Sequence, residues 1–164
     1  MLEKYMLTNT QFRNVTENGH VTGFQVRTRT PAYRGNFLSF LDDMRITVDG
    51  ELFPPEKLKI SLGGRAYTLA EAKTATAVHW DFGKFATLIA SKAGGLSPGV
   101  HTVEVALMVR SSYELPPELD PEGIFKQGGY GGGAKKTATR EERYKFTWNT
   151  PGAGRVTRKM TLVQ

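Results

Sequence analysis

Apolar and polar residues alternate with a period of two along much of this sequence. In the stretch 103–109, Val103, Val105 and Leu107 share one face of an extended chain, and the residues between them point to the other face. The same pattern recurs in the stretches 20–30, 45–53, 57–69, 143–148 and 156–163. A sheet with one apolar face must bury it against a second sheet. The sequence therefore predicts an all-β fold, an antiparallel β-sandwich of immunoglobulin-like or jelly-roll-like type with about seven to nine strands.

Turn residues between these stretches indicate which strands pair. The Asp-Gly pair at 49–50 and the Gly-Gly pair at 63–64 are typical of two-residue hairpin turns. The second turn places Leu58 opposite Leu69 on one face of the hairpin. The stretch 69–74 is interpreted as helical, over about one turn. The predicted core consists of the apolar members of the alternating strands: Phe24, Val26, Ile46, Val48, Leu58, Ile60, Val103, Val105, Leu107, Phe146 and Leu162.

One long connection breaks the alternation. It spans 111–142 and contains the stretch GIFKQGGYGGGAKK, in which six of fourteen residues are glycine. Loops of more than about 12–15 residues are uncommon in compact domains and are usually functional or disordered. We therefore predict a single β-sandwich domain over 1–164 with a long Gly-rich insertion loop at 111–142.

The large side chains of this loop suggest what it does. Tyr113, Phe125 and Tyr130 are costly to leave in water, and an ordered partner surface would bury them. We therefore predict that the loop is an arm that contacts a partner subunit, and we add Arg34 as a fourth candidate for that interface. A linker that merely connects two strands remains the alternative, because both kinds of loop have the same length.

The net charge of +6 is concentrated in the last quarter of the chain. Residues 126–164 hold nine Lys or Arg and two Glu, whereas the rest of the chain is nearly neutral. This segment could follow a nucleic-acid backbone, but it has few aromatic side chains for base stacking and no RGG repeat. A solvated linker is favoured over an RNA-binding segment, and we expect no nucleic-acid partner.

Cysteine is absent, which excludes disulfides and thiolate chemistry, so any metal site would need His and carboxylate ligands. The N-terminal residues lack the apolar run of a signal peptide. No stretch approaches the roughly 20 apolar residues of a membrane span. We therefore expect a soluble, cytoplasmic protein that makes no membrane contact.

Residues that could support catalysis are few. His101 continues the apolar face of its strand, which favours a histidine at the edge of the core over a metal ligand. His79 and Asp81 could supply two metal ligands, but a catalytic site needs a third. Asp42 and Asp43 are interpreted as a turn before the next strand. We therefore predict no catalytic residue and no metal site in this chain.

Several stretches together resemble a known family. The resemblance is to the small β subunit of the C-glycoside deglycosidases, over about 12–113 and again in the closing stretch RKMTLV. The stretches that resemble it are VTGFQVRTRTPAYRGNFLSFLDDMRITVDGE, YTLAEA, WDFGKFATL and LSPGVHTVEVALMVRSSY. Its most specific residues are Gly23-Phe24, Tyr33-Arg34-Gly35, Ser39 and Val48-Asp49-Gly50. The Gly-rich loop is not part of the resemblance.

The resemblance implies a two-subunit bacterial enzyme, a heterodimer or a multiple of one. A larger α subunit with a TIM-barrel fold would bind a divalent metal, commonly manganese, and carry the acid and base residues. The pair would act as a carbon–carbon lyase on a 3-oxo-C-glycoside, cleaving the bond between the 3-oxo sugar and a flavonoid-like aglycone. Oxidation at sugar C3 acidifies the C2 proton, which makes this elimination possible.

We therefore expect a non-catalytic β subunit that holds no cofactor of its own. A stand-alone carbohydrate-binding module is the first alternative, and a basic nucleic-acid-binding domain is the second.

Overall fold

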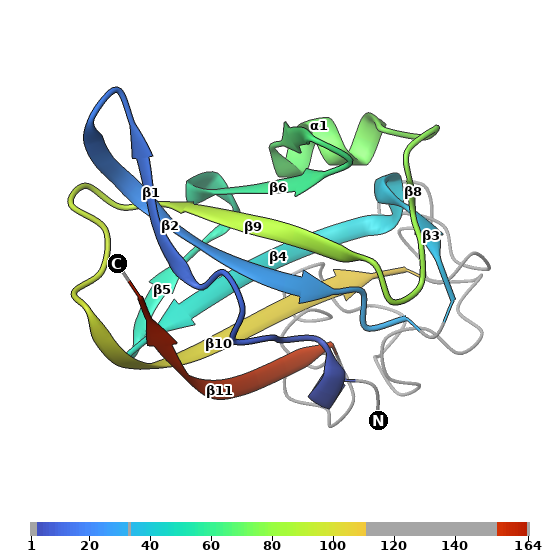
Figure 1. The fold of residues 1–164 in the computed structure, drawn as a ribbon. Helices are drawn as coiled ribbons and strands as arrows, with labels where there is room; N and C mark the ends of the chain where they lie inside the picture. Colours follow the sequence, from blue (N-terminus) through green and yellow to red (C-terminus); the bar gives the residue numbers. More distant parts are fainter. Residues whose placement is uncertain (1–2, 33, 111–153, 164) are drawn as a thin grey trace, which may run out of the picture.

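The computed structural model describes residues 3–32, 34–110 and 154–163, which form two antiparallel sheets packed face to face (Figure 1). The all-β, antiparallel fold predicted from the alternation is confirmed. The expected strand at 143–148, with Phe146, lies outside the described residues. So does the loop at 111–142.

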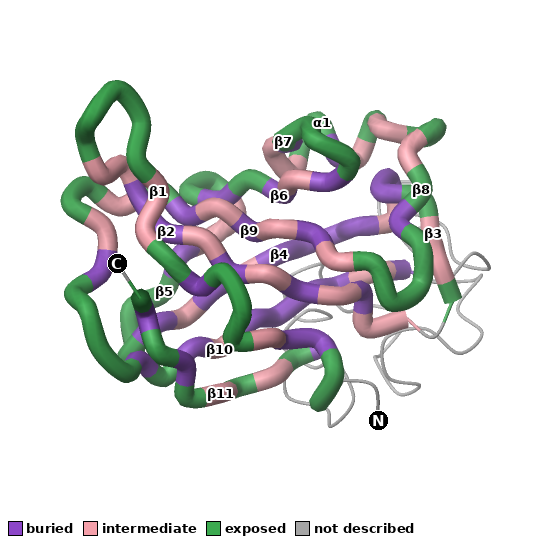
Figure 2. Tube along the Cα trace, viewed as in Figure 1, coloured by how far each residue is buried: buried purple, intermediate pink, exposed green. Residues whose placement is uncertain are grey.

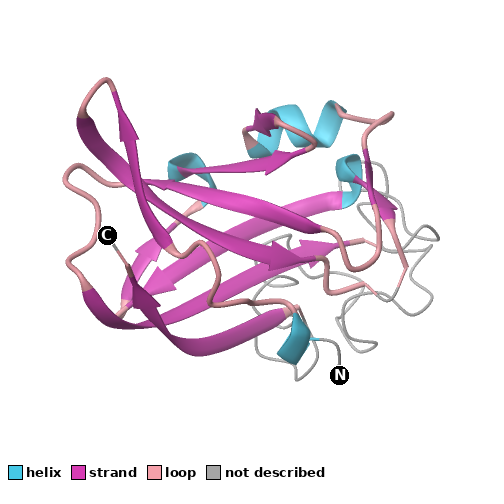
Figure 3. Ribbon diagram, in the orientation of Figure 1, coloured by secondary structure: helices cyan, strands magenta, loops and turns pink. Residues whose placement is uncertain are grey.

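Five strands form the first sheet and four form the second (Figure 3). In spatial order, the first sheet contains β1 (Arg13–Glu17), β2 (His20–Arg29), β9 (Phe85–Ser91), β6 (Leu58–Leu62) and β7 (Arg65–Tyr67). The second contains β11 (Arg155–Leu162), β10 (Gly99–Val109), β4 (Leu41–Val48) and β5 (Glu51–Phe53). A two-stranded sheet of β3 (Asn36–Phe37) and β8 (His79–Trp80) stands apart from both. The helical segments are η1 (Glu3–Tyr5), η2 (Leu38–Phe40), η3 (Pro55–Lys57) and α1 (Leu69–Thr74).

The α1 helix has the bounds predicted from the sequence, and it corrects one predicted strand pair. Thr68 caps the helix: its Oγ1 accepts from the Glu71 N–H at 3.2 Å, and a Glu71 carboxylate oxygen accepts from the Thr68 N–H at 2.9 Å. This reciprocal capping box ends the strand before Leu69. The predicted pairing of Leu58 with Leu69 is therefore wrong, and Leu58 lies opposite Ala90 of β9 instead.

The core lies between the two sheets, where the inward faces of the strands are buried (Figure 2). Every predicted core residue in the described part of the chain is buried, and Phe24 and Phe53 meet edge to face with ring centroids 4.9 Å apart. The N-terminal segment adds three core residues that the alternation did not predict: Met6, Leu7 and Phe12. They pack between the sheets because the Met6 carbonyl accepts from the Arg29 N–H at 2.8 Å and Leu7 bridges to Thr28.

The two ends of the sandwich have different compositions. At the end that we call the His101 end, β4 turns into β5 and β10 begins, on the left of Figure 1. At the opposite end, which we call the Arg110 end, β4 begins, β10 ends and the β3–β8 sheet is attached. Within the described ranges, no helix has the length and hydropathy needed to cross a bilayer.

Candidate functional site

A buried ion pair lies at the Arg110 end. Arg110 Nε donates to Asp42 Oδ1 at 2.8 Å, and the side chains of the two residues are 8% and 3% exposed. Arg110 Nη2 donates to the Ser39 carbonyl at 2.9 Å, and the guanidinium lies 5.3 Å from the centroid of the Phe40 ring. Because a charge buried without a partner is costly, these contacts fix the start of β4 against the end of β10.

The two neighbouring aspartates do not form the turn that the sequence predicted. Both lie in β4 and are buried, at a point where the register with β10 shifts between Leu41 and Asp43. Asp43 Oδ2 lies 3.0 Å from Arg45 Nη2. The prediction was wrong because each aspartate has an arginine partner that makes its burial in a strand tolerable.

The β3–β8 sheet presents an imidazole and an aromatic ring at the same end. Phe37 lies opposite His79, with ring centroids 5.3 Å apart in an edge-to-face arrangement. His79 Nδ1 lies 2.6 Å from Asp81 Oδ1. On the inward side, Trp80 is buried and donates from Nε1 to the Lys84 carbonyl at 2.8 Å. Trp80 thus anchors β8, and His79 faces outward.

Gly35 is needed for this arrangement. A Cβ atom at this position would lie 2.5 Å from His79 Cε1 and 3.0 Å from the Trp80 carbonyl oxygen. Any side chain would therefore displace the imidazole or the strand that holds it.

The predicted interface residue Arg34 is exposed and directly precedes this sheet. Two large apolar side chains of the same region are also exposed, Phe37 at 43% and Phe82 at 59%. We call the set of Arg34, Phe37, His79, Asp81 and Phe82 the Arg110-end patch. The sequence does not single out Phe37 or Phe82, since a phenylalanine beside short apolar runs gives no sign of its exposure. The other predicted interface residues, Tyr113, Phe125 and Tyr130, lie outside the described residues.

The described residues contain few side chains that could act together as metal ligands. Among residues 3–32, 34–110 and 154–163, no group of three or more His, Asp or Glu side chains is placed so that it could hold a metal ion. His79 and Asp81 make a mutual contact with both side chains largely exposed. Such a surface pair contributes little to stability. The pair therefore offers at most two ligands, and the described residues do not fit a three-ligand metal site.

The nearby arginines of β2 have local roles. The guanidinium groups of Arg27 and Arg29 lie 4.3 and 3.9 Å from the centroid of the Phe85 ring. Arg29 also donates to the carbonyls of Gly83 and Tyr5, both at 3.0 Å. Both guanidinium groups therefore pack on the Phe85 ring, and Arg29 also makes hydrogen bonds to the backbone.

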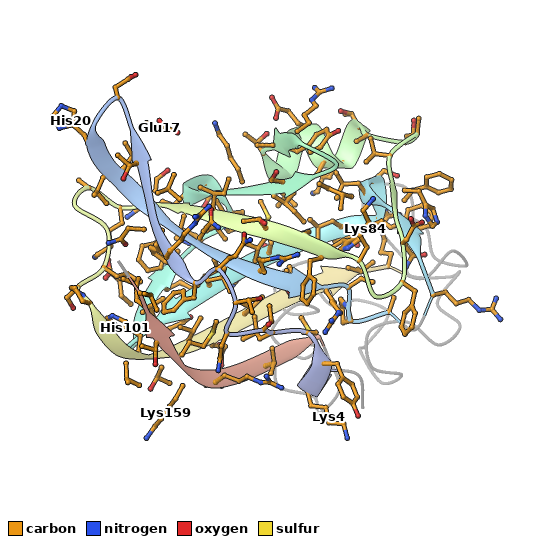
Figure 4. All side chains as sticks on the ribbon, in the orientation of Figure 1. Lys4, Glu17, His20, Lys84, His101 and Lys159 are labelled. Carbon is orange, nitrogen blue, oxygen red and sulfur yellow. The ribbon has the colours of Figure 1, made fainter. Side chains whose placement is uncertain are left out.

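His101 closes the opposite end of the sandwich (Figure 4). Its Nδ1 lies 2.6 Å from Asp49 Oδ2, its Nε2 lies 2.7 Å from the Ser97 carbonyl, and its ring meets Phe12 edge to face. Both acceptors require an N–H donor, so the geometry selects the doubly protonated imidazolium. The hydrogen bond to the Asp49 carboxylate raises the pKa of His101, and the same bond lowers the pKa of Asp49. The predicted core-edge histidine is confirmed, with a structural role.

Comparison with known proteins gives a consistent result. The sequence matches the family model described as C-glycoside deglycosidase beta subunit over residues 2–113. A "C-glycoside deglycosidase beta subunit" of Eubacterium cellulosolvens is 34% identical over 126 residues, which are 74% of this chain and 85% of the relative. A "3'-dehydrocarminate deglycosidase beta subunit" of a Microbacterium species is 34% identical over 94 residues, or 56% of this chain and 69% of the relative. A "C-glycoside deglycosidase beta subunit" of Arthrobacter globiformis is 36% identical over 63 residues, or 38% of this chain and 48% of the relative.

Proposed function

The chain belongs to the C-glycoside deglycosidase beta subunit family, and from this membership we propose that it is the small, non-catalytic subunit of a heteromeric C-glycoside deglycosidase. The enzyme would cleave the C–C bond between a 3-oxo sugar and an aromatic, flavonoid-like aglycone. The observation that supports this most strongly is the family match over residues 2–113, together with relatives whose names describe them as beta subunits of deglycosidases.

The metal and the acid and base residues are proposed to belong to a larger α subunit with a TIM-barrel fold. When bound there, the divalent metal, manganese as the family resemblance implies, would supply Lewis-acid stabilisation of the oxidised sugar. The described residues of this chain offer two metal ligands at most, at His79 and Asp81. A division of labour between the subunits accounts for a chain of this size with so few candidate catalytic groups.

The Arg110-end patch is the surface that we propose for contact with the α subunit. Exposed Phe37 and Phe82 would gain most from burial, since large aromatic side chains dominate the energetics of protein interfaces. Arg34 is exposed and lies just before β3, so it belongs to the same proposed surface. The predicted contacts of Tyr113, Phe125 and Tyr130 stay predictions from the sequence.

Co-expression with an α subunit encoded by a neighbouring gene tests the proposal. Affinity capture of this chain should bring down the second polypeptide, and the complex should cleave a 3-oxo-C-glycoside that neither chain cleaves alone. A chain that purifies without a partner and binds sugar by itself would favour a carbohydrate-binding module. A chain whose affinity for nucleic acid falls steeply with salt would favour the basic-domain alternative.

Calorimetry on the isolated chain tests the division of labour. Titration with Mn²⁺ should show no binding at micromolar concentration. The His79→Ala variant should behave in the same way as the unmodified chain. Micromolar binding that disappears in the His79→Ala variant would place a metal in this subunit and contradict the proposal.

A further inference from the structure

A groove of about 800 Å³ follows the edge of the second sheet. It lies between the N-terminal half of β4, the connection from β5 to β6 that contains η3, and the α1 helix. The groove exists because β5 pairs only with 46–48, so the earlier residues of β4 have no strand beside them on that side in the described structure. The α1 helix packs against β4 and β6 and forms the far wall.

At the centre of the unpaired edge of β4, a further strand could not form a backbone hydrogen bond to Met44. Leu107 donates its N–H to the Gly154 carbonyl at 2.9 Å on the far side of β10, so the Leu107–Met44 pair is not hydrogen bonded across β10 and β4. The Met44 N–H therefore points into the groove, where Asp43 Oδ1 accepts it at 2.9 Å. Because this donor is already satisfied, an occupant of the groove must bind through side-chain contacts.

The charges of the groove leave a positive excess. The two aspartates in its floor are paired, Asp42 with Arg110 and Asp43 with Arg45. The remaining charged residues of the lining are three lysines and one glutamate, namely Lys57, Lys59, Lys73 and Glu56.

None of these three lysines makes an ion pair with a carboxylate among the described residues. By contrast, Lys92, which follows the end of β9, forms an ion pair with Glu51, with its Nζ 2.7 Å from Glu51 Oε2. The groove therefore presents three cationic side chains that a carboxylate-bearing occupant could satisfy.

The lysines are spread along the groove. Lys57 ends η3 and Lys59 lies in β6, whereas Lys73 belongs to α1 on the opposite wall. Apolar side chains lie among them, with Leu52 and Ala70 exposed. Spaced cations with apolar surface between them match an extended acidic peptide better than one compact anion. None of the described residues that line the groove is aromatic, so they offer no platform for nucleic-acid bases.

We propose that the groove between β4, η3 and α1 is a docking site for an acidic segment of the α subunit, whose carboxylates bind Lys57, Lys59 and Lys73. The identity of the partner rests on the proposed function. The groove is continuous with the Arg110 end, because Asp42 lines the groove and pairs with Arg110, and because α1 also packs against η2. A single partner could therefore cover both surfaces.

A charge-reversal pair of variants tests the groove. One variant changes its three lysines (K57E, K59E and K73E). The control changes three exposed basic residues away from both proposed contact surfaces (K4E, R13E and K159E), which also make no ion pair among the described residues; Figure 4 labels Lys4 and Lys159. Both variants alter the net charge equally, so they differ chiefly in position. The milder variant K57Q, K59Q and K73Q removes the three charges without reversing them, and it replaces the groove variant in the test if thermal unfolding shows that the groove variant is misfolded.

The affinity of the full chain for its α subunit is the first readout. The groove variant should bind about tenfold or more weakly, because three charge contacts are lost and replaced by repulsion. The difference should shrink at high salt. The control should bind within about twofold of the unmodified chain. Equal affinities for the two reversal variants would overturn the docking site and leave the proposed function intact.

A hexaglutamate peptide and an oligouridine RNA serve as partner-free probes of the isolated chain. Hexaglutamate should shift the amide NMR signals of Lys57, Lys59 and Lys73, and the groove variant should lose these shifts. Binding of oligouridine at these lysines without binding of hexaglutamate would overturn the proposal. Hexaglutamate binding by a chain that associates with no α subunit would support the acidic-segment groove and contradict the proposed function.

Discussion

The two ends of the sandwich are each closed by an ion pair, and the pairs have different designs. At the Arg110 end, Arg110 and Asp42 are both buried, and their side chains are 8% and 3% exposed. At the His101 end, the His101 side chain is only 8% exposed, but the side chain of its partner Asp49 is 53% exposed. In the first pair, water cannot reach either side chain, so it cannot replace a partner that is removed. The second can exchange its partner for water and can be switched by pH.

The largest effect is expected from removing one charge at the Arg110 end. Asp42→Asn should lower the free energy of unfolding by about 3–5 kcal/mol, because Arg110 would stay buried without its carboxylate. Urea denaturation would measure this loss. The double variant Asp42→Leu with Arg110→Met should recover much of it, since both charges leave together. If Asp49→Asn destabilised the protein more than Asp42→Asn, the contrast between the ends would be wrong.

At the His101 end, His101→Gln should cost about 1–2 kcal/mol, because the imidazolium donates two hydrogen bonds that a neutral amide replaces incompletely. The cost should depend on pH. The pKa of His101 is raised in the folded chain, chiefly by the hydrogen bond to Asp49. Its contribution is therefore fully present below the ordinary histidine pKa of about 6.5 and is lost as the pH rises through the raised value.

The comparison of unfolding free energies at about pH 6 and about pH 9 tests this sign. The difference between the unmodified chain and His101→Gln should be larger at the lower pH. Asp49 affects stability at acidic pH, because the hydrogen bond to His101 lowers the pKa of its carboxyl group. Its contribution to the free energy of unfolding is present above about pH 3.9 and is lost as the pH falls through the lowered pKa. A penalty for His101→Gln that grew toward alkaline pH would refute the imidazolium assignment.

A smaller effect is expected from Gly35→Ala. The added methyl group would meet His79 Cε1 and the Trp80 carbonyl, and the imidazole can move more cheaply than the strand. We expect a loss of about 1 kcal/mol in the free energy of unfolding. The His79 ring signals in an NMR spectrum should shift as the contact with Asp81 is lost. Unchanged ring signals would mean that the site accommodates a Cβ atom.

The smallest effect on stability is expected from Phe37→Ala, because the side chain is already 43% exposed. Thermal unfolding should change by less than about 0.5 kcal/mol, as for surface positions in general. Association with the α subunit should weaken by about tenfold if the Arg110-end patch is the interface. Val100→Ala, at the His101 end and 67% exposed, is the control for removing apolar surface away from both proposed contact surfaces.

Sequence reasoning predicted the elements whose signals are local. The alternation in β10 and the helical stretch at 69–74 both depend on residues close together in the chain, so these elements are visible in the sequence. The first half of β4 was missed because Asp42 and Asp43 have a turn-like composition, and their burial depends on arginines. For Asp42 the partner is Arg110, 68 positions away. A sequence pattern cannot reveal such a distant partner.

The candidate site was predicted only in part, for a related reason. Arg34 was predicted at the interface and is exposed just before β3, but its contact with a partner stays a prediction. The exposure of Phe37 follows from the β3–β8 pairing, and strands of two residues are too short to show a period. The lysines of the groove come from three separate elements, which become neighbours because the β6–β7 hairpin reverses the chain and α1 packs back against β6.

The N-terminal segment has a consequence for folding during synthesis. Arg158 of β11 donates to the Leu7 carbonyl at 3.1 Å and also to the Lys4 carbonyl, so contacts join residues more than 150 positions apart. A ribosome releases the chain from the N-terminus at about 5–20 residues per second, so Met6 and Leu7 emerge long before β11 exists. These apolar residues lack the contacts of β11, whether exposed or bound by a chaperone, until residue 158 has left the exit tunnel. The strand that completes the packing of the N-terminal segment is therefore synthesised more than 150 residues after it.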